Sequence, residues 1–265
     1  MIFSITDTYY LIVSYILAGL LGLCVGSFLN VVIYRVPLHM SLVSPPSHCP
    51  QCENKIRWYD NIPVLSYCLL GGKCRVCKEH IPFRYTFVEI TNTLLWLMCV
   101  AIFSDNVVYM CLSMIVCSVC LCVFFIDLEH LIIPDRFQII LAAAGVLAVF
   151  ADTEYDWISH LIGLGAATAV FLAVGYAVSF FKKREALGGG DVKLAACAGL
   201  LLGWQKFILM MLLASVSASI YFVFKMRKDN ESVETAFAPF LTFGLVISML
   251  FGNFIINWYI SLLVG

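Results

Sequence analysis

The chain has 265 residues, of which 62% are hydrophobic and only 12% are charged, and its formal net charge is −1. Soluble domains are not built from so apolar a composition, so the sequence predicts an all-α polytopic membrane protein surrounded by lipid. The near-zero net charge argues against a nucleic acid as partner.

The apolar runs predict about eight transmembrane helices. The first run, residues 8–34, has 27 residues without a charge, is too long for a signal-peptide core and has no basic segment before it, so we expect a retained span. The sixth run is short because only 12 residues separate Lys193 from Lys206. It either crosses with both lysines snorkelling outward or turns back within the membrane. The expected spans are residues 9–34, 87–104, 107–127, 137–151, 157–181, 192–205, 207–224 and 237–262.

The distribution of lysine and arginine favours eight crossings. With eight crossings, 15 of the 16 basic residues fall on one side and only Lys206 falls on the other. A re-entrant sixth run would move the basic cluster at 225–228 and reduce the ratio to 13 against 3. The positive-inside rule therefore predicts cytoplasmic loops at 36–86, 128–136, 182–191 and 225–236, with both chain ends outside.

Four cysteines in the polar loop predict a metal site. Cys49 and Cys52 form one C-x2-C pair, Cys74 and Cys77 form another, and 21 residues separate the pairs. This spacing is one residue beyond the usual range for two zinc knuckles, and four thiolates suit tetrahedral structural zinc. Disulfides are the alternative, but thiols stay reduced in the cytoplasm. Other residues that could replace a ligand are Cys68, His48 and His80.

Two aspartates are candidates for an acid pair. Asp127 ends an apolar run, and Asp191 follows Gly188, Gly189 and Gly190, whose freedom of backbone conformation suggests a hinge at Gly188 and Gly190. Alone, each has an ordinary explanation: Asp127 as an interfacial charge and Asp191 as a helix N-cap. The predicted topology places both on one membrane face at similar depth, so we expect them to share a proton and activate water.

Two other acids have simpler explanations. Asp135 follows Pro134 at the start of a predicted helix, where the helix dipole stabilises an acid. Glu89 follows Arg84 at the start of the second span, and we expect a structural role for it.

These motifs together resemble the type IV prepilin peptidases over nearly the whole chain. Gly188–Asp191 is similar to the GxGD motif of that family, and the segment from Ile126 to Asp135 is similar to its other aspartate motif. Two positions depart from the family pattern, Thr86 and Ala238, and neither is expected to touch the acids. Further matching segments are Gly26–Arg35, the cysteine loop, Asn61–Pro63, Arg84–Tyr85 and Val88–Glu89.

The resemblance implies a bifunctional enzyme of the bacterial inner membrane. Such enzymes cleave the basic leader of type IV prepilins and pseudopilins, with Asp127 and Asp191 as the matching catalytic aspartates, and then methylate the new N-terminal amine with S-adenosylmethionine. The implied division is a first helix at 1–36, a zinc loop linked to methylation at 37–86, and a peptidase domain at 87–265. No nucleotide-binding motif is visible, so the methyl-donor site stays unknown.

Three alternatives stay open at this stage. One is a peptidase without methyltransferase activity. Another is a proton-coupled transporter that uses the two acids, although the sequence shows no repeat and places the acids at the membrane edge rather than the midplane. The third is a zinc-binding scaffold, which would leave the glycine-rich aspartate segment unexplained.

Overall fold

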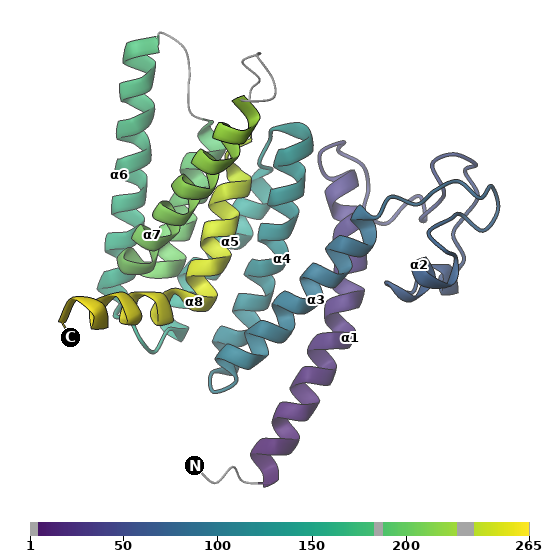
Figure 1. Cartoon of the computed structure of the whole chain (residues 1–265), viewed down its shortest axis with the longest axis horizontal. Coiled ribbons are helices and arrows are strands. Elements are labelled where there is room, and N and C mark those ends of the chain that lie inside the picture. The colour runs from purple at the N-terminus through teal and green to yellow at the C-terminus, as the bar shows by residue number, and fades with distance from the viewer. Residues whose placement is uncertain (1–4, 183–187, 227–235, 265) are drawn as a thin grey trace. The chain divides into compact units, whose positions relative to one another are not determined.

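The computed structural model describes residues 5–182, 188–226 and 236–264, and within these ranges every regular element is a helix (Figure 1). The chain divides into two compact units, residues 1–105 and residues 106–265. Residues 183–187 and 227–235, which carry part of the basic charge counted above, lie outside the described residues. The helices are α1 (Ile5–Arg35), η1 (Trp58–Asn61), α2 (Leu65–Leu69), α3 (Arg84–Phe103), α4 (Val107–His130), α5 (Asp135–Ala151), α6 (Trp157–Lys182), α7 (Gly189–Met226) and α8 (Ala238–Val264).

In the first unit, α1 and α3 pack against one another through small and polar residues. A Cβ added at Gly26 would lie 2.8 Å from the Cα of Glu89, so only glycine permits this approach of the two backbones. The side-chain amide of Asn92 donates to the carbonyl of Gly22 over 2.8 Å. Interhelical hydrogen bonds of this kind are favourable where no water competes for them. The loop with η1 and α2 leaves from the end of this helix pair.

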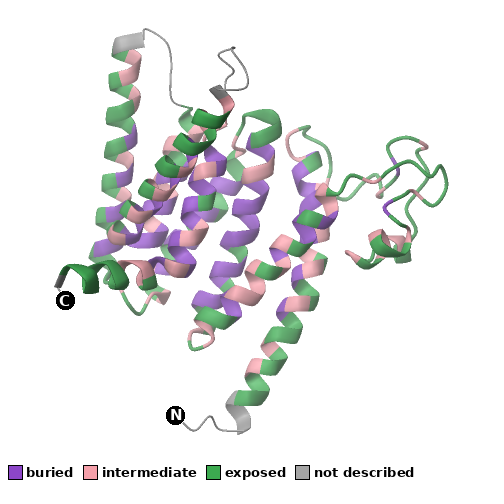
Figure 2. Cartoon of the chain, viewed as in Figure 1, coloured by how far each residue is buried: buried purple, intermediate pink, exposed green. Residues whose placement is uncertain are grey.

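In the second unit, α4 is the central helix. In its most apolar stretch 72% of the residues are buried inside the protein, against 17% for α6, and Figure 2 shows the same contrast in colour. Apolar side chains that stay exposed on a membrane helix face lipid, so α6 lies at the periphery of this unit and α4 in its core.

Helix α7 is two antiparallel helices that meet at Gly203. Gly203 has φ 73° and ψ 169°, and an added Cβ would lie 2.8 Å from the Ser159 hydroxyl, so a side chain there is excluded by both conformation and space. The middle of α7 lies beside the start of α6, whereas Gly190 contacts Ile133 and Tyr221 contacts Phe240. Both ends of α7 therefore lie at the same end of the unit.

The predicted fold class is confirmed. Within the described residues, six helices are long and apolar enough to cross a membrane. Two further segments complete the predicted eight: α5, whose 17 residues span about 26 Å at 1.5 Å per residue, and the second half of α7. The reversal falls at Gly203 rather than at the predicted Lys206, since the left-handed conformation needs glycine.

The prediction that Lys206 snorkels outward is wrong. Lys206 is only 2% exposed. The aliphatic part of its side chain packs against Gly252 of α8, and its ammonium lies 4.8 Å from the ring centre of Tyr155. A lysine can be buried in this way because the face of an aromatic ring attracts the cation. Its near neighbours are therefore a second helix and a loop of the protein.

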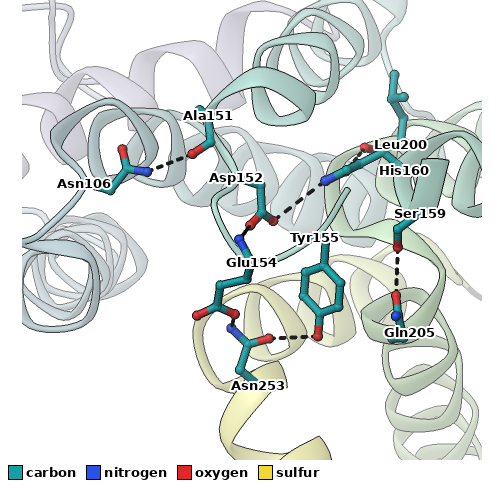
Figure 3. A network of polar contacts seen from close by, with 10 residues as sticks. All are labelled: Asn106, Ala151, Asp152, Glu154, Tyr155, Ser159, His160, Leu200, Gln205 and Asn253. Carbon is teal, nitrogen blue, oxygen red and sulfur yellow. Dashed lines mark hydrogen bonds and ion pairs between the residues drawn. The ribbon is translucent and has the colours of Figure 1, made fainter. Parts of the chain in front are cut away.

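Polar contacts join the five main helices of the second unit at the end where α7 reverses (Figure 3). The His160 ring, which is fully buried, lies 2.9 Å from the Leu200 carbonyl and 3.8 Å from the Asp152 carboxylate. Other contacts in the same network are Asn106 to the Ala151 carbonyl, Tyr155 and Glu154 to Asn253, and Ser159 to Gln205. This network fixes the end of the unit that lies away from the candidate acids.

Candidate active site and metal centre

Asp127 lies in the last turn of α4 and is 5% exposed. The helix ends because Leu131 takes a left-handed conformation with φ 55°, and its N–H donates to the Asp127 carbonyl over 3.0 Å. The side chain accepts a hydrogen bond of 3.1 Å from the backbone N–H of Ala238, the first residue of α8. The first N–H groups of a helix have no partner within it, so this contact satisfies one of them and orients the carboxyl.

Asp191 lies in the first turn of α7 and is half-buried. Its backbone N–H donates to the Gly188 carbonyl over 3.0 Å, and the Gln138 side chain donates to the Gly190 carbonyl over 3.3 Å. A Cβ on Gly190 would lie 3.2 Å from Ile133, so a close approach explains this glycine. Gly188 and Gly190 have ordinary φ angles here, and their role as a hinge stays a prediction.

The structure brings the two carboxyls to one end of the second unit, although 64 residues separate them in the sequence. They are close enough for the charge of Asp127 to act on Asp191. Two carboxyls that interact in this way do not both ionise freely, and a pair of this kind can share one proton. Such a pair can deprotonate a water molecule with one member and hydrogen-bond a carbonyl with the other.

Asp135 lies outside this pair. It begins α5 after Pro134, as the sequence indicates, and its carboxylate accepts from the Lys193 ammonium over 2.7 Å. Both side chains are largely exposed, at 72% for Asp135 and 60% for Lys193. An exposed ion pair contributes little to stability, but this one links the starts of α5 and α7 beside Asp191.

Neither of the two departures from the family pattern was expected to touch the acids, and this is wrong for Ala238. Its N–H is the partner of Asp127. Because the contact is made by the backbone, alanine and glycine offer the same donor, and the departure leaves the interaction intact. Sequence reasoning missed the contact because 111 residues separate the two partners.

The four predicted metal ligands converge. The sulfur atoms of Cys49, Cys52, Cys74 and Cys77 all lie within 4.8 Å of one another, and those of Cys49 and Cys77 are 3.8 Å apart. Tetrahedral zinc with Zn–S bonds of about 2.3 Å requires sulfur atoms about 3.8 Å apart. Cys68 lies on α2 outside this cluster and is exposed. The residues present therefore fit a single structural zinc ion.

The two cysteine pairs repeat one local structure. In each, the N–H of the residue four positions after the first cysteine donates to that cysteine's carbonyl, and this residue has a left-handed φ: 56° for Glu53 and 62° for Lys78. In each, the residue before the first cysteine forms an isolated bridge with the residue seven positions later, which pairs His48 with Lys55 and Lys73 with His80. The repeat was not visible in the sequence because neither left-handed position is a glycine.

The four thiols can all be ionised together only beside a cation. Hydrogen bonds from the side chain and backbone of Asn54 lower the pKa of Cys52 to about 6. A backbone hydrogen bond from Glu79 lowers the pKa of Cys77, but desolvation and the neighbouring thiols together raise it to about 12. Four thiolates at these distances repel one another, so a bound divalent cation is needed to keep all four ionised.

An ion pair connects η1 to the second cysteine pair. Arg75 donates two hydrogen bonds to one oxygen of Asp60 and one to the other, at 2.6–3.1 Å. The hydrogen bond from Arg75 holds the pKa of Asp60 below its usual value. The Arg75 guanidinium also lies 5.5 Å from the ring centre of Tyr59. This bidentate contact fixes the loop around the metal site.

The fold and the two sites define a multi-pass membrane protein with a pair of acids at one end of its second unit and a four-thiol centre in its first. Residues 20–103 match the model of the bacterial peptidase A24 N-terminal domain, and residues 114–223 match the model of the type IV leader peptidase family. No solved structure matches the chain significantly.

Curated relatives match along nearly all of the chain. A prepilin leader peptidase/N-methyltransferase of Legionella pneumophila is 30% identical, and the match covers 93% of this chain and 94% of that protein. Proteins of the same name from Vibrio cholerae and Pectobacterium carotovorum are 34% and 31% identical over 88% and 89% of this chain, and over 94% and 92% of their own length. The chain belongs to the type IV leader peptidase family.

Proposed function

We propose that the chain is a prepilin leader peptidase and N-methyltransferase of the bacterial inner membrane. It cleaves the basic leader of type IV prepilins or pseudopilins and then methylates the new N-terminal amine, with S-adenosylmethionine as the methyl donor. The support is membership of the family, relatives that carry both activities in their name, and the acid pair Asp127 and Asp191. The transporter and scaffold alternatives are not favoured by any of these observations.

Asp127 and Asp191 are the proposed catalytic residues. One ionised carboxylate takes a proton from water while the protonated partner donates a hydrogen bond to the scissile carbonyl. The oxygen of water then forms a bond to the carbonyl carbon, and the amide C–N bond breaks as the leaving amine takes a proton from the pair. The N–H of Ala238 keeps the Asp127 carboxyl oriented throughout.

We further propose that the acids and the cysteine loop face the cytoplasm. The lysine and arginine asymmetry of 15 against 1 supports this orientation. Asp127, Glu129, Asp135 and Asp191 then lie near the cytoplasmic boundary, where their charges would attract a basic leader. The apolar stem of the substrate would stay in the lipid beside the helices.

Zinc bound by Cys49, Cys52, Cys74 and Cys77 has a structural role in this proposal. Zinc with four thiolate ligands has no open position for substrate, and its contribution is to fold the loop at 37–86. We assign methylation to that loop and the helices it joins, and proteolysis to the membrane-embedded remainder at 87–265. Gly188 and Gly190 would allow Asp191 to move as substrate enters.

The experiment is incubation of the purified chain with a prepilin, with and without S-adenosylmethionine, followed by mass spectrometry of the product. We expect loss of the leader under both conditions and a gain of one methyl group only with the donor. Cleavage without methylation would restrict the function to the peptidase, and no cleavage of any prepilin or pseudopilin would contradict the proposal.

A further inference from the structure

A cavity of 370 Å³ lies in the first unit, at the end of α1 where the cysteine loop begins. One wall is a helical stripe of α1, the second is the segment 42–47, and the third contains Asn61 and Pro63. The volume is within the range of small-molecule sites, which is about 300–1,000 Å³. The residues that α1 contributes are Cys24, Ser27, Phe28, Val31 and Arg35.

The cavity combines flat apolar surface with charged and polar groups. Phe28, Val31 and the prolines at 45 and 46 supply the apolar surface. Arg35 is 6% exposed, and its guanidinium donates to the carbonyls of Ser41 over 2.9 Å and Pro45 over 2.6 Å. A guanidinium has five N–H donors, so these two bonds hold the wall in place and leave capacity for an anionic group of a ligand.

The third wall is held in a strained conformation. Val64, which follows Pro63, has φ 60° and ψ −49°, a backbone conformation that β-branched residues rarely adopt. Its N–H donates to the buried Glu89 carboxylate over 2.7 Å, and the Ser27 hydroxyl bonds the same carboxylate. Strain of this kind persists where surrounding contacts enforce it, and it is concentrated at functional sites. Here the contact is the hydrogen bond to Glu89, whose carboxylate is bonded in turn by Ser27, a residue that lines the cavity.

We propose that this cavity binds the methyl donor S-adenosylmethionine. The donor has a flat aromatic base, hydroxyl groups, a carboxylate and a positively charged sulfonium. The cavity offers apolar surface for the base, Ser27 and Asn61 for hydroxyls, and Arg35 for the carboxylate. The inference rests on the proposed methyltransferase function and adds to it the site at which the donor binds.

The first test fills the cavity. Val31→Trp places a large side chain in it, and Leu20→Trp is the matched control, because Leu20 lies on the exposed surface of the same helix at 61% exposure. The measurement is equilibrium binding of radiolabelled S-adenosylhomocysteine to the full-length protein in detergent. We expect Val31→Trp to weaken binding by about tenfold or more, equivalent to about 1.4 kcal/mol. Both variants should cleave prepilin as the unmodified chain does.

The second test needs no substitution. Cys24 lines the cavity, whereas Cys68 is exposed on α2 outside it. Peptide mapping after brief exposure to N-ethylmaleimide should show Cys24 protected by S-adenosylhomocysteine and Cys68 equally labelled with and without it. Failure of Cys24 to react in the free protein would contradict an open cavity.

The outcomes separate the two proposals. If the unmodified chain binds the donor and methylates pilin, but Val31→Trp binds equally well or Cys24 is not protected, the cavity assignment is wrong and the function stands. If the unmodified chain cleaves prepilin but neither binds the donor nor methylates, the methyltransferase proposal and the cavity assignment both fail.

Discussion

The backbone N–H of Ala238 donates to the side chain of Asp127 across 3.1 Å, and this contact joins the end of α4 to the start of α8. It gives the buried carboxyl a fixed orientation without using a second ionisable group. The start of α8 is therefore part of the candidate active site.

Removing this donor should impair cleavage. Ala238→Pro eliminates the N–H but keeps a residue that is well tolerated at the first position of a helix. We expect the rate of prepilin cleavage to fall by about tenfold to a hundredfold, the range typical when an outer partner that orients a functional side chain is removed. Ala238→Gly, which keeps the N–H, is the control. Equal rates for both variants and the unmodified chain would show that the contact has no functional role.

The reversal in α7 should depend on Gly203. Alanine there must adopt a φ of 73° and approach the Ser159 hydroxyl to 2.8 Å, so Gly203→Ala should lower the thermal midpoint in detergent. Gly165→Ala is the comparison, because no other atom lies within 4 Å of its added Cβ. Gly165→Ala should therefore leave the thermal midpoint unchanged or raise it. An unchanged midpoint for Gly203→Ala would contradict the reversal at this residue.

The four-thiol centre should bind one zinc ion per chain. Cys74→Ser should abolish stoichiometric zinc and increase proteolysis of the loop, because a loop with little apolar core depends on the metal for its fold. Cys68→Ser should retain both zinc and protease resistance. Elemental analysis with limited proteolysis provides both readouts. Zinc lost only when Cys68 is also changed would refute this ligand set.

Acid should release the metal from the same centre. Each thiolate must lose its proton to bind zinc, so protons compete with the metal more strongly as the pH falls. Cys52, with a pKa lowered to about 6, should stay ionised to lower pH than an ordinary cysteine, and Asn54→Ala should remove the part of this effect that comes from the Asn54 side chain. We expect zinc release from Asn54→Ala to begin at higher pH than from the unmodified chain. Identical release curves would exclude this role for Asn54.

The membrane orientation predicts which positions are labelled from each side. A cysteine reagent that does not cross membranes should reach a cysteine introduced at Glu154 from the periplasm and one introduced at Asn54 only after the inner membrane is opened. These tests use a background in which the reactive native cysteines have been replaced. Labelling of position 54 in intact cells would reverse the proposed topology.

Local chemistry allowed much of the fold to be predicted from the sequence. Uninterrupted apolar runs indicated the helices, Pro134 indicated where α5 begins, and cysteine spacing indicated the metal cluster. The position of Lys206 was not predictable, because its partner Tyr155 lies 51 residues away and the sequence does not reveal their contact. The same applies to the Ala238 donor, which depends on how α8 packs against α4.

The cavity in the first unit was also beyond sequence reasoning. Its walls come from one helix and two separate loop segments, and Val64 adopts a conformation that its residue type disfavours. Such a feature arises from tertiary contacts such as the hydrogen bond to Glu89, and no periodicity or motif records it.

The most direct test of the central claim is prepilin processing by Asp127→Asn and Asp191→Asn, read by mass spectrometry. A pair that shares one proton needs both members, so each variant should lose cleavage by about a thousandfold or more while it stays folded and retains zinc. Asp135→Asn, which breaks only an exposed ion pair with Lys193, should cleave within about threefold of the unmodified chain. Substantial processing by either Asp127→Asn or Asp191→Asn would contradict the acid pair as the catalytic centre.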